Sequence, residues 1–167
     1  MRPALLALLM FATAFTSCSA TAGRSDPPTP EDFFRRPDRV QIFIADMMGQ
    51  GIEYDEAAPR NGYFVFPKEG PELSRRKRRA LAEIWVSPKD FVPYPPRKCG
   101  FNPDIAFRFW IGTKWVDVVA CFSCRQLMFL DDKNNPIPDA GFLDGFPVMQ
   151  DIAKQAFPEG GFNPGWL

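Results

Sequence analysis

The sequence predicts an α+β fold: a small antiparallel sheet with one or two covering helices, preceded by a cleaved signal and a flexible tether. Three observations indicate this fold. Residues 39–45 place apolar side chains at every second position, as half-buried strands do. Two further alternating runs flank Gly112 and Thr113, a suitable two-residue hairpin loop. Residues 74–86 carry apolar side chains at helical spacing.

The composition fits one globular domain and excludes several classes of function. The chain has 167 residues, of which 46% are hydrophobic and 24% charged, as in ordinary globular proteins. Twenty basic side chains balance twenty acidic ones, so no net positive charge favours nucleic acid. Histidine is absent, which excludes Ser-His-Asp triads, Cys-His pairs and histidine-ligated metals. We therefore expect no nucleic-acid partner, and we infer no cofactor and no small-molecule substrate.

Residues 1–17 have the order of a secretory signal. Arg2 supplies the positive charge, residues 4–12 form an apolar run, and small residues follow. The apolar run is far shorter than the roughly 20 residues that span a bilayer. We expect export, with removal of this segment.

The end of the signal, Phe15-Thr16-Ser17-Cys18-Ser19, resembles a bacterial lipoprotein signal, with Phe15 where that family usually carries an aliphatic residue. The resemblance implies that Cys18 is acylated, becomes the first residue of the mature chain and anchors it in a membrane. Ser19 implies sorting to the outer membrane. The alternative is ordinary secretion, because Ala20-Thr21-Ala22 fits an A-x-A cleavage pattern. Cleavage after Ala22 would discard Cys18 and leave a soluble periplasmic or secreted protein.

The mature chain is expected to hold one domain. Residues 18–37 form the lipid anchor and flexible tether, because this stretch is poor in large apolar groups and Pro27, Pro28 and Pro30 disfavour a helix. Residues 38–167 then form a single globular α+β domain.

The domain begins with strands and loops. After the strand at 39–45, residues 46–59 contain an acidic cluster, Glu53-Tyr54-Asp55-Glu56, which we interpret as a solvated loop rather than a cation site. Asn61 and Gly62 predict a turn into a short aromatic strand at 63–66. Pro67 is expected to end that strand.

Residues 74–86 form the clearest predicted helix, with Ser74 as its N-cap. Leu81, Ile84 and Trp85 lie along one face at spacings of three and four. This face should dock on the sheet.

The five consecutive cations at residues 75–79 are expected to form the solvated side of that helix, because consecutive residues point around a helix rather than to one face. The alternative is a contact with an anionic partner such as lipid headgroups.

The hairpin at 104–122 has a register that the sequence determines. A Gly112-Thr113 loop makes Ile111 the partner of Lys114. Counting outward places opposite charges across from each other and gathers a purely apolar face, both of which a one-residue slip destroys. The first face carries the pairs Trp110 with Trp115, Arg108 with Asp117, and Ala106 with Val119. The other face carries Phe109 with Val116, Phe107 with Val118, and Ile105 with Ala120.

The last part of the chain predicts a third strand at 126–130, a polar turn at 131–136 and a helix at 147–156. Val148, Ile152 and Phe157 would face the body of the domain.

Three aromatic side chains are candidates for a binding surface: Trp110, Trp115 and Tyr94. The tryptophan pair on the outer face of the hairpin would stack a ligand unless another element covers it. Tyr94 lies in the proline-rich segment 91–96, which we expect to be a stiff loop covering the sheet. The alternative is that this segment presents Tyr94 to an envelope protein.

The body contains Cys99, Cys121 and Cys124, which allow three interpretations. A structural disulfide with one free cysteine is expected in an oxidising compartment, and the parity of the register favours Cys99 with Cys124. A redox dithiol at Cys121 and Cys124 requires an activating helix, but the following residues predict a strand. A metal site would combine the three thiolates with a carboxylate such as Asp104.

The sequence thus favours a membrane-anchored lipoprotein domain with a non-enzymatic structural or binding role in the bacterial cell envelope. An envelope protein or anionic lipid would be its further partner. The main alternative is a periplasmic thiol-redox or metal-binding protein centred on Cys99, Cys121 and Cys124.

Overall fold

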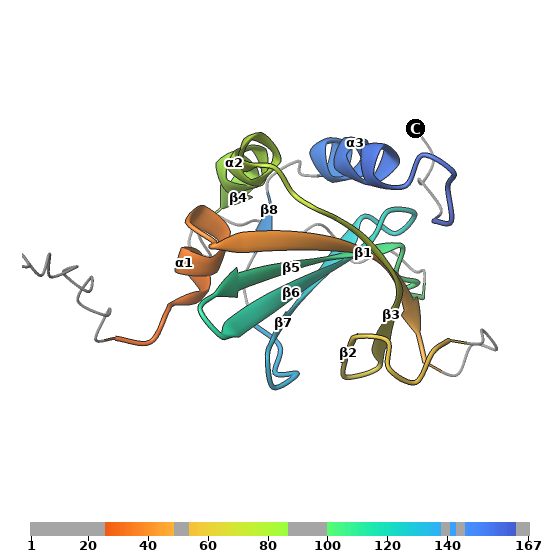
Figure 1. Cartoon of the computed structure of the whole chain (residues 1–167), viewed down its shortest axis with the longest axis horizontal. Helices are drawn as coiled ribbons and strands as arrows, with labels where there is room; N and C mark the ends of the chain where they lie inside the picture. The colour runs from red at the N-terminus through yellow and green to blue at the C-terminus, as the bar shows by residue number, and fades with distance from the viewer. Residues whose placement is uncertain (1–25, 49–53, 87–99, 138–140, 143–145, 163–167) are drawn as a thin grey trace, which may run out of the picture.

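The computed structural model describes residues 26–48, 54–86, 100–137, 141–142 and 146–162. Six strands form one curled antiparallel sheet in the order β2-β3-β1-β5-β6-β7, and three helices accompany it (Figure 1). The fold class is therefore α+β, as the sequence predicts. The strands of the sheet are β1 (Arg39–Met47), β2 (Arg60–Asn61), β3 (Phe64–Glu72), β5 (Ile105–Ile111), β6 (Lys114–Cys121) and β7 (Gln126–Asp131). A separate two-stranded sheet pairs β4 (Trp85–Val86) with β8 (Gly141–Phe142).

Helix α1 (Pro30–Arg35) corrects the expectation that residues 18–37 are a flexible tether. The Thr29 hydroxyl accepts a hydrogen bond from the Asp32 N–H, and the Asp32 carboxylate accepts one from the Thr29 N–H, which makes a capping box. Pro30 occupies the first helical position, where a missing N–H costs nothing. Phe33 and Phe34 are buried, so within the described residues the packed domain already includes α1, before the predicted strand at 39–45.

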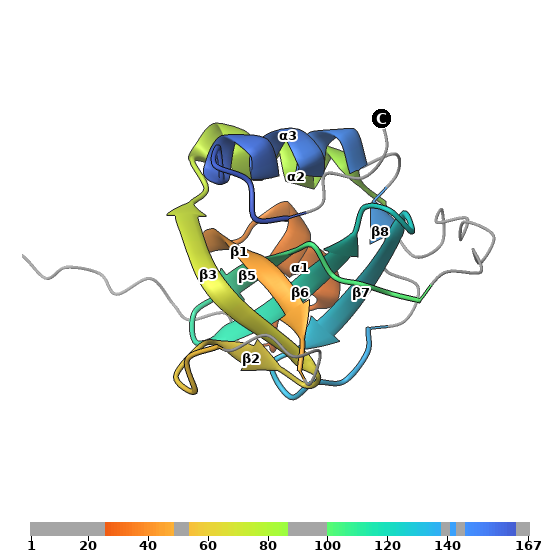
Figure 2. The same cartoon turned by 90° about the vertical axis from the view of Figure 1, so that its right-hand side faces the viewer.

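Strand β3 corrects the expectation that Pro67 ends the strand, because it continues to Glu72. Its pairing with β1 shifts register twice. At each shift, two residues of β3 lie opposite a single residue of β1. One of the two is a proline, Pro71 at the first shift and Pro67 at the second. A bulge tolerates proline because the ladder lacks a regular hydrogen bond there. Bulges also bend a strand, and β3 follows a curved path (Figure 2).

The hairpin of β5 and β6 has the predicted register at all seven pairs, from Ile105 with Ala120 to Ile111 with Lys114. Gly112, the first loop residue, has φ +56°, a conformation that glycine adopts without steric cost. The predicted third strand is also confirmed as β7, which pairs with β6.

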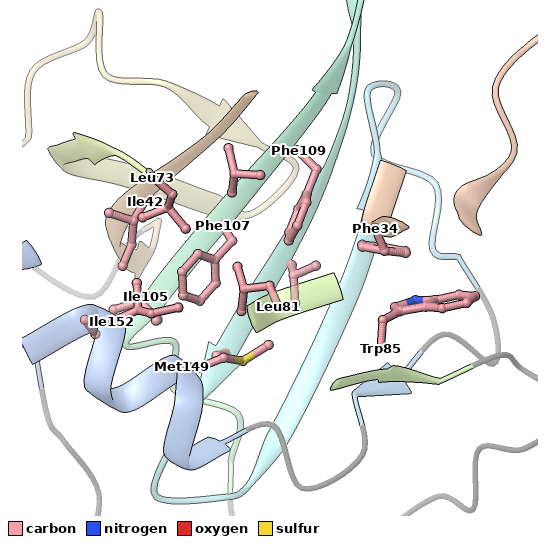
Figure 3. Close-up of a cluster of buried hydrophobic side chains, with 14 of the residues drawn as sticks. Phe34, Ile42, Leu73, Leu81, Trp85, Ile105, Phe107, Phe109, Met149 and Ile152 are labelled. Atoms are coloured by element: carbon pink, nitrogen blue, oxygen red, sulfur yellow. The ribbon is translucent and has the colours of Figure 1, made fainter. Parts of the chain in front are cut away.

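The main hydrophobic core lies between the sheet and its helices, where side chains of α1, α2, α3 and the strands meet (Figure 3). Helix α2 (Arg75–Ile84) has Ser74 as its N-cap, as predicted, and buries Leu81. It ends two residues earlier than expected, because Trp85 is extended and begins β4. Helix α3 (Phe146–Ala156) adds Met149 and Ile152 to the core.

A second, smaller core fills the other face of the sheet. The alternating pattern predicts that this face of the hairpin is the outer side, yet Ala106 and Val119 are fully buried. The sheet curls over itself, so that strands distant in order bring their side chains together there. The members of this second core are Phe43, Ala45, Phe64, Phe66, Ala106, Val119 and Leu130.

Candidate functional site

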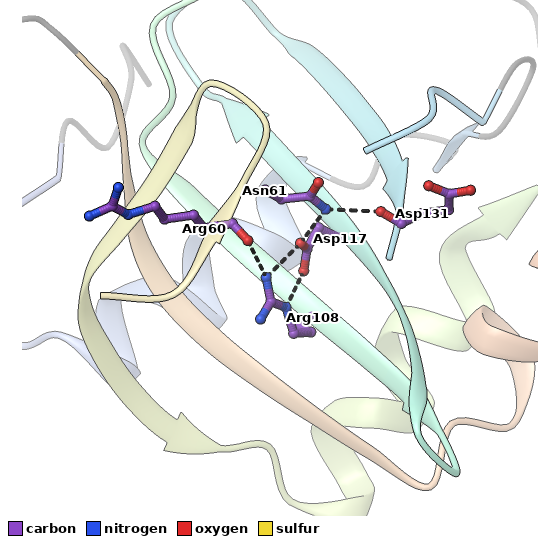
Figure 4. Close-up of polar contacts among 5 residues, drawn as sticks. All are labelled: Arg60, Asn61, Arg108, Asp117 and Asp131. Atoms are coloured by element: carbon purple, nitrogen blue, oxygen red, sulfur yellow. Dashed lines mark hydrogen bonds and ion pairs between the residues drawn. The ribbon is translucent and has the colours of Figure 1, made fainter. Parts of the chain in front are cut away.

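The most polar buried feature is the Arg108 cluster, which we define as Arg108, Asp117 and Asn61 together with the carbonyl groups of Arg60 and Asp131 (Figure 4). Adjacent strands place Arg108 and Asp117 opposite each other. The Arg108 Nε and Nη2 atoms donate to the two Asp117 carboxylate oxygens at 2.7 and 2.9 Å. This bidentate geometry is the strong form of an arginine–carboxylate pair.

Asn61 completes the cluster from β2, 56 residues earlier in the chain than Asp117. Its Nδ2 atom donates to the Asp117 Oδ2 at 2.7 Å and to the Asp131 carbonyl at 3.1 Å. Arg108 Nη2 also donates to the Arg60 carbonyl at 3.3 Å. The local sequence predicts only a turn at Asn61, because the contacts of its side chain depend on how the sheet curls.

Burial raises the pKa of Asp117, while hydrogen bonds and charge attraction from Arg108, and a hydrogen bond from Asn61, act to lower it. Four aromatic rings surround the Arg108 guanidinium, with centroids 5.1 to 5.9 Å away. They are Phe43, Phe66, Trp110 and Trp115. Since the two charged groups bond to each other inside a packed interior, the arrangement serves to hold β2, β5 and β6 together.

The predicted aromatic surface is partly covered. Trp110 is half-buried beneath Arg39, whose guanidinium carbon lies 3.9 Å from the ring centroid. Trp115 lines a surface cavity of about 350 Å³ together with Pro27, Pro28 and Phe33. The N-terminal segment therefore forms one wall of the cavity beside Trp115. Tyr94, the third candidate, lies outside the described residues.

The cysteines of the C-x-x-C motif are in different states. Cys124 is disulfide-bonded, whereas Cys121 is free and fully buried. The Cys121 sulfur accepts a hydrogen bond from the Cys124 N–H at 3.4 Å and lies 3.4 Å from the Ser123 hydroxyl oxygen. The two cysteines are thus not joined to each other. Cys99 and Cys18 lie outside the described residues, so the pairing of Cys99 with Cys124 stays a prediction.

The disulfide removes one thiolate from the metal site that the sequence analysis considered. The Asp104 carboxylate accepts a hydrogen bond from the Phe122 N–H at 2.7 Å. Within the described ranges, no three Cys, Asp or Glu side chains lie close enough together to hold a metal ion. In the acidic cluster at 53–56, the Asp55 carboxylate accepts a hydrogen bond from the Ala57 N–H at 2.8 Å.

Helix α2 carries the basic run, and its five cations differ in exposure. Arg75, Arg76 and Arg79 are exposed, whereas Lys77 and Arg78 are half-buried. A groove of about 610 Å³ separates α2 from α3 and is lined on the α2 side by Arg76, Lys77 and Ala80. None of the helices in the described part of the chain has the length and apolar character needed to cross a membrane.

Comparison with known proteins gave no match among family models, curated proteins or solved structures.

Proposed function

We propose that the protein is an exported domain, anchored in a membrane through a lipid on Cys18, with a non-enzymatic structural or binding role in the bacterial cell envelope. The observation that carries this proposal is the order of the N-terminal residues. Arg2 precedes an apolar run at 4–12, and Cys18 follows small residues at its end. Ser19 supports sorting to the outer membrane.

The described domain begins a short distance along the chain from Cys18, which is consistent with an anchor there. Pro30, the first residue of α1, lies twelve positions after Cys18. Such a short connection would hold the domain close to the bilayer.

The interior of the curled sheet supports a role exercised at the outer surface. The buried polar side chains of Arg108, Asp117 and Asn61 make hydrogen bonds with one another. Phe43 and Phe66 pack in the same interior. The grooves that described residues border lie on the outside, between α2 and α3 and beside Trp115.

Metabolic labelling with palmitate tests the proposal. The full-length chain should incorporate label and sediment with membranes, and Cys18→Ala should abolish both. Cys121→Ala is the matched control, because it removes a buried cysteine and should leave labelling intact. A parent chain that carries no label and appears in the soluble periplasmic fraction would overturn the proposal in favour of secretion.

One observation favours thiol chemistry as a second candidate function. The free Cys121 thiol lies three positions from the disulfide-bonded Cys124 and contacts its backbone N–H. A thiolate at Cys121 would attack the Cys124 sulfur and release its present partner as a thiolate. An insulin-reduction assay with dithiothreitol as the electron source tests this candidate. Turnover that Cys121→Ser abolishes would support it, and equal rates with and without the protein would exclude it.

A further inference from the structure

Three arginines of α2 gather on one side of the helix. Position 76 follows position 75 directly, and position 79 lies four positions after position 75. These spacings place the three side chains within about 100° of each other around a helix. The structure agrees, because Arg75, Arg76 and Arg79 are the exposed members of the run. We call these three side chains the α2 arginine face. These three side chains are solvated, as the sequence predicts for the run, whereas Lys77 and Arg78 are half-buried.

The positive charge of this face is little neutralised. Within the described residues, Arg75 and Arg76 have no ion pair. Arg79 pairs with Glu83 at 3.0 Å, but both side chains are largely exposed, at 81% and 65%. Solvent screens such a pair, so the face retains a positive field.

The position of the cations is unfavourable for the helix itself. The N-terminus of a helix carries partial positive charge, so acidic residues stabilise it and basic residues destabilise it. Helix α1 follows this rule with Glu31 and Asp32 in its first turn. Helix α2 has no acidic residue there and begins with Arg75 and Arg76. Helix stability therefore does not explain the α2 arginine face.

The groove beside the face combines cations with apolar surface. Arg76 and Lys77 form part of its wall, and Ala80, Val148 and Ile152 contribute apolar surface. Asp151 also lines the groove, where its carboxylate accepts a hydrogen bond from the Gln155 amide at 2.7 Å. An anionic phospholipid offers the complementary pattern, a phosphate next to acyl chains.

We propose that the α2 arginine face and the adjoining groove dock the domain on an anionic phospholipid bilayer. This inference deepens the proposed function and rests on it for the presence of a membrane. Asp26 lies eight positions after Cys18, and this stretch, fully extended, reaches at most about 29 Å. A lipid on Cys18 would therefore keep Asp26, the first described residue, within that distance of the bilayer.

Vesicle flotation of the full-length chain carrying Cys18→Ser tests the inference without any contribution from acylation. The chain should bind mixed phosphatidylcholine and phosphatidylglycerol vesicles more tightly than pure phosphatidylcholine vesicles. Each basic side chain near an anionic surface contributes roughly fivefold in affinity. Arg75→Gln with Arg76→Gln should therefore weaken binding to the mixed vesicles about 25-fold.

The matched control is Lys68→Gln with Lys133→Gln, which makes the same change in net charge at exposed positions outside α2. It should change binding by no more than about twofold, because charges distant from the contact are screened. Unchanged thermal melting of both double variants excludes unfolding as the cause of a loss.

Equal losses in the two double variants would overturn the docking surface and indicate attraction by net charge alone. Equal binding of the parent to mixed and neutral vesicles would overturn it in favour of apolar insertion. Because the chain in this experiment lacks Cys18, its outcome is independent of palmitate labelling. Failure of the anchor and failure of the docking surface are thus separate results.

Discussion

Arg108 and Asp117 form a bidentate ion pair across β5 and β6, with N–O distances of 2.7 and 2.9 Å. The Asp117 side chain is fully buried and that of Arg108 is 10% exposed. A pair of this kind holds its partners in register but gains little net free energy, because both charges lose their hydration. Removing one partner alone leaves the other buried without compensation.

Asp117→Ala should therefore lower the free energy of unfolding by about 3 to 5 kcal/mol. The double variant Arg108→Met with Asp117→Leu should lose less than Asp117→Ala alone, because it leaves no buried charge. Urea denaturation with a constant m-value measures both. If the double variant loses more than Asp117→Ala, the ion pair is not the coupled unit described above.

Lys114 and Asp132 provide a more exposed pair for comparison. Their N–O distance is 2.9 Å, and their side chains are 54% and 15% exposed. Lys114→Ala should cost at most about 1 kcal/mol.

The raised pKa of Asp117 predicts a pH dependence of stability. Burial raises this pKa above its ordinary value of 3.8, so the folded protein holds the proton more tightly than the unfolded chain. The associated stabilisation is complete below pH 3.8 and is lost as the pH rises through the folded-state pKa. Asp117→Asn does not titrate. Relative to this variant, the parent should lose stability from acid towards neutral pH in urea denaturation, and a constant or rising difference would contradict the assignment.

Phe34 tests whether α1 belongs to the domain. Its ring is fully buried, stacks on Trp85 and meets Phe109 and Phe129 edge-on. Phe34→Ala should lower the free energy of unfolding by about 3 to 5 kcal/mol. Tyr63, which is 76% exposed, is the control, and Tyr63→Ala should change stability by less than about 0.5 kcal/mol. If Phe34→Ala lowers the free energy of unfolding by less than about 0.5 kcal/mol, α1 is part of the tether and not of the domain.

Cys124 and Cys121 should respond differently to the same substitution. Cys124→Ser removes a disulfide, which typically costs 2 to about 5 kcal/mol in a non-reducing buffer. Cys121→Ser retains a group that accepts the Cys124 N–H hydrogen bond and should cost about 1 kcal/mol. Peptide mapping after alkylation provides a second readout, because buried Cys121 should react only after unfolding. Rapid alkylation of Cys121 in the native protein would contradict its burial.

Local patterns predicted the parts of the fold that short-range geometry determines. The loop at Gly112 is only two residues long, so it fixes the partners of every residue in the hairpin. Ser74 and Leu81 likewise locate α2 through capping and periodicity, which act within a few residues.

The expectations that fail are those that treat a proline as a breaker regardless of its context. Pro30 begins α1, where it is favourable, and Pro67 lies in a bulge of β3. Thr29 and Asp32 around Pro30 are a local capping-box signal that could have located α1, whereas the place of Pro67 depends on its strand partner.

The Arg108 cluster was only half predictable. Counting along the hairpin gave Arg108 opposite Asp117, but burial of the pair and the contribution of Asn61 depend on pairings between distant segments. Similarly, alternation along β5 and β6 gave two faces, whereas the curl that buries both results from the register shifts between β1 and β3.

The membrane anchor is tested most directly by the intact mass of the protein purified from its native envelope under non-reducing conditions, with thiol alkylation before and after reduction. The proposal predicts a chain that begins at Cys18, carries the mass of its acyl groups, and gains alkylatable thiols at a disulfide pair only after reduction. An unmodified chain that begins at Gly23 would contradict the anchor.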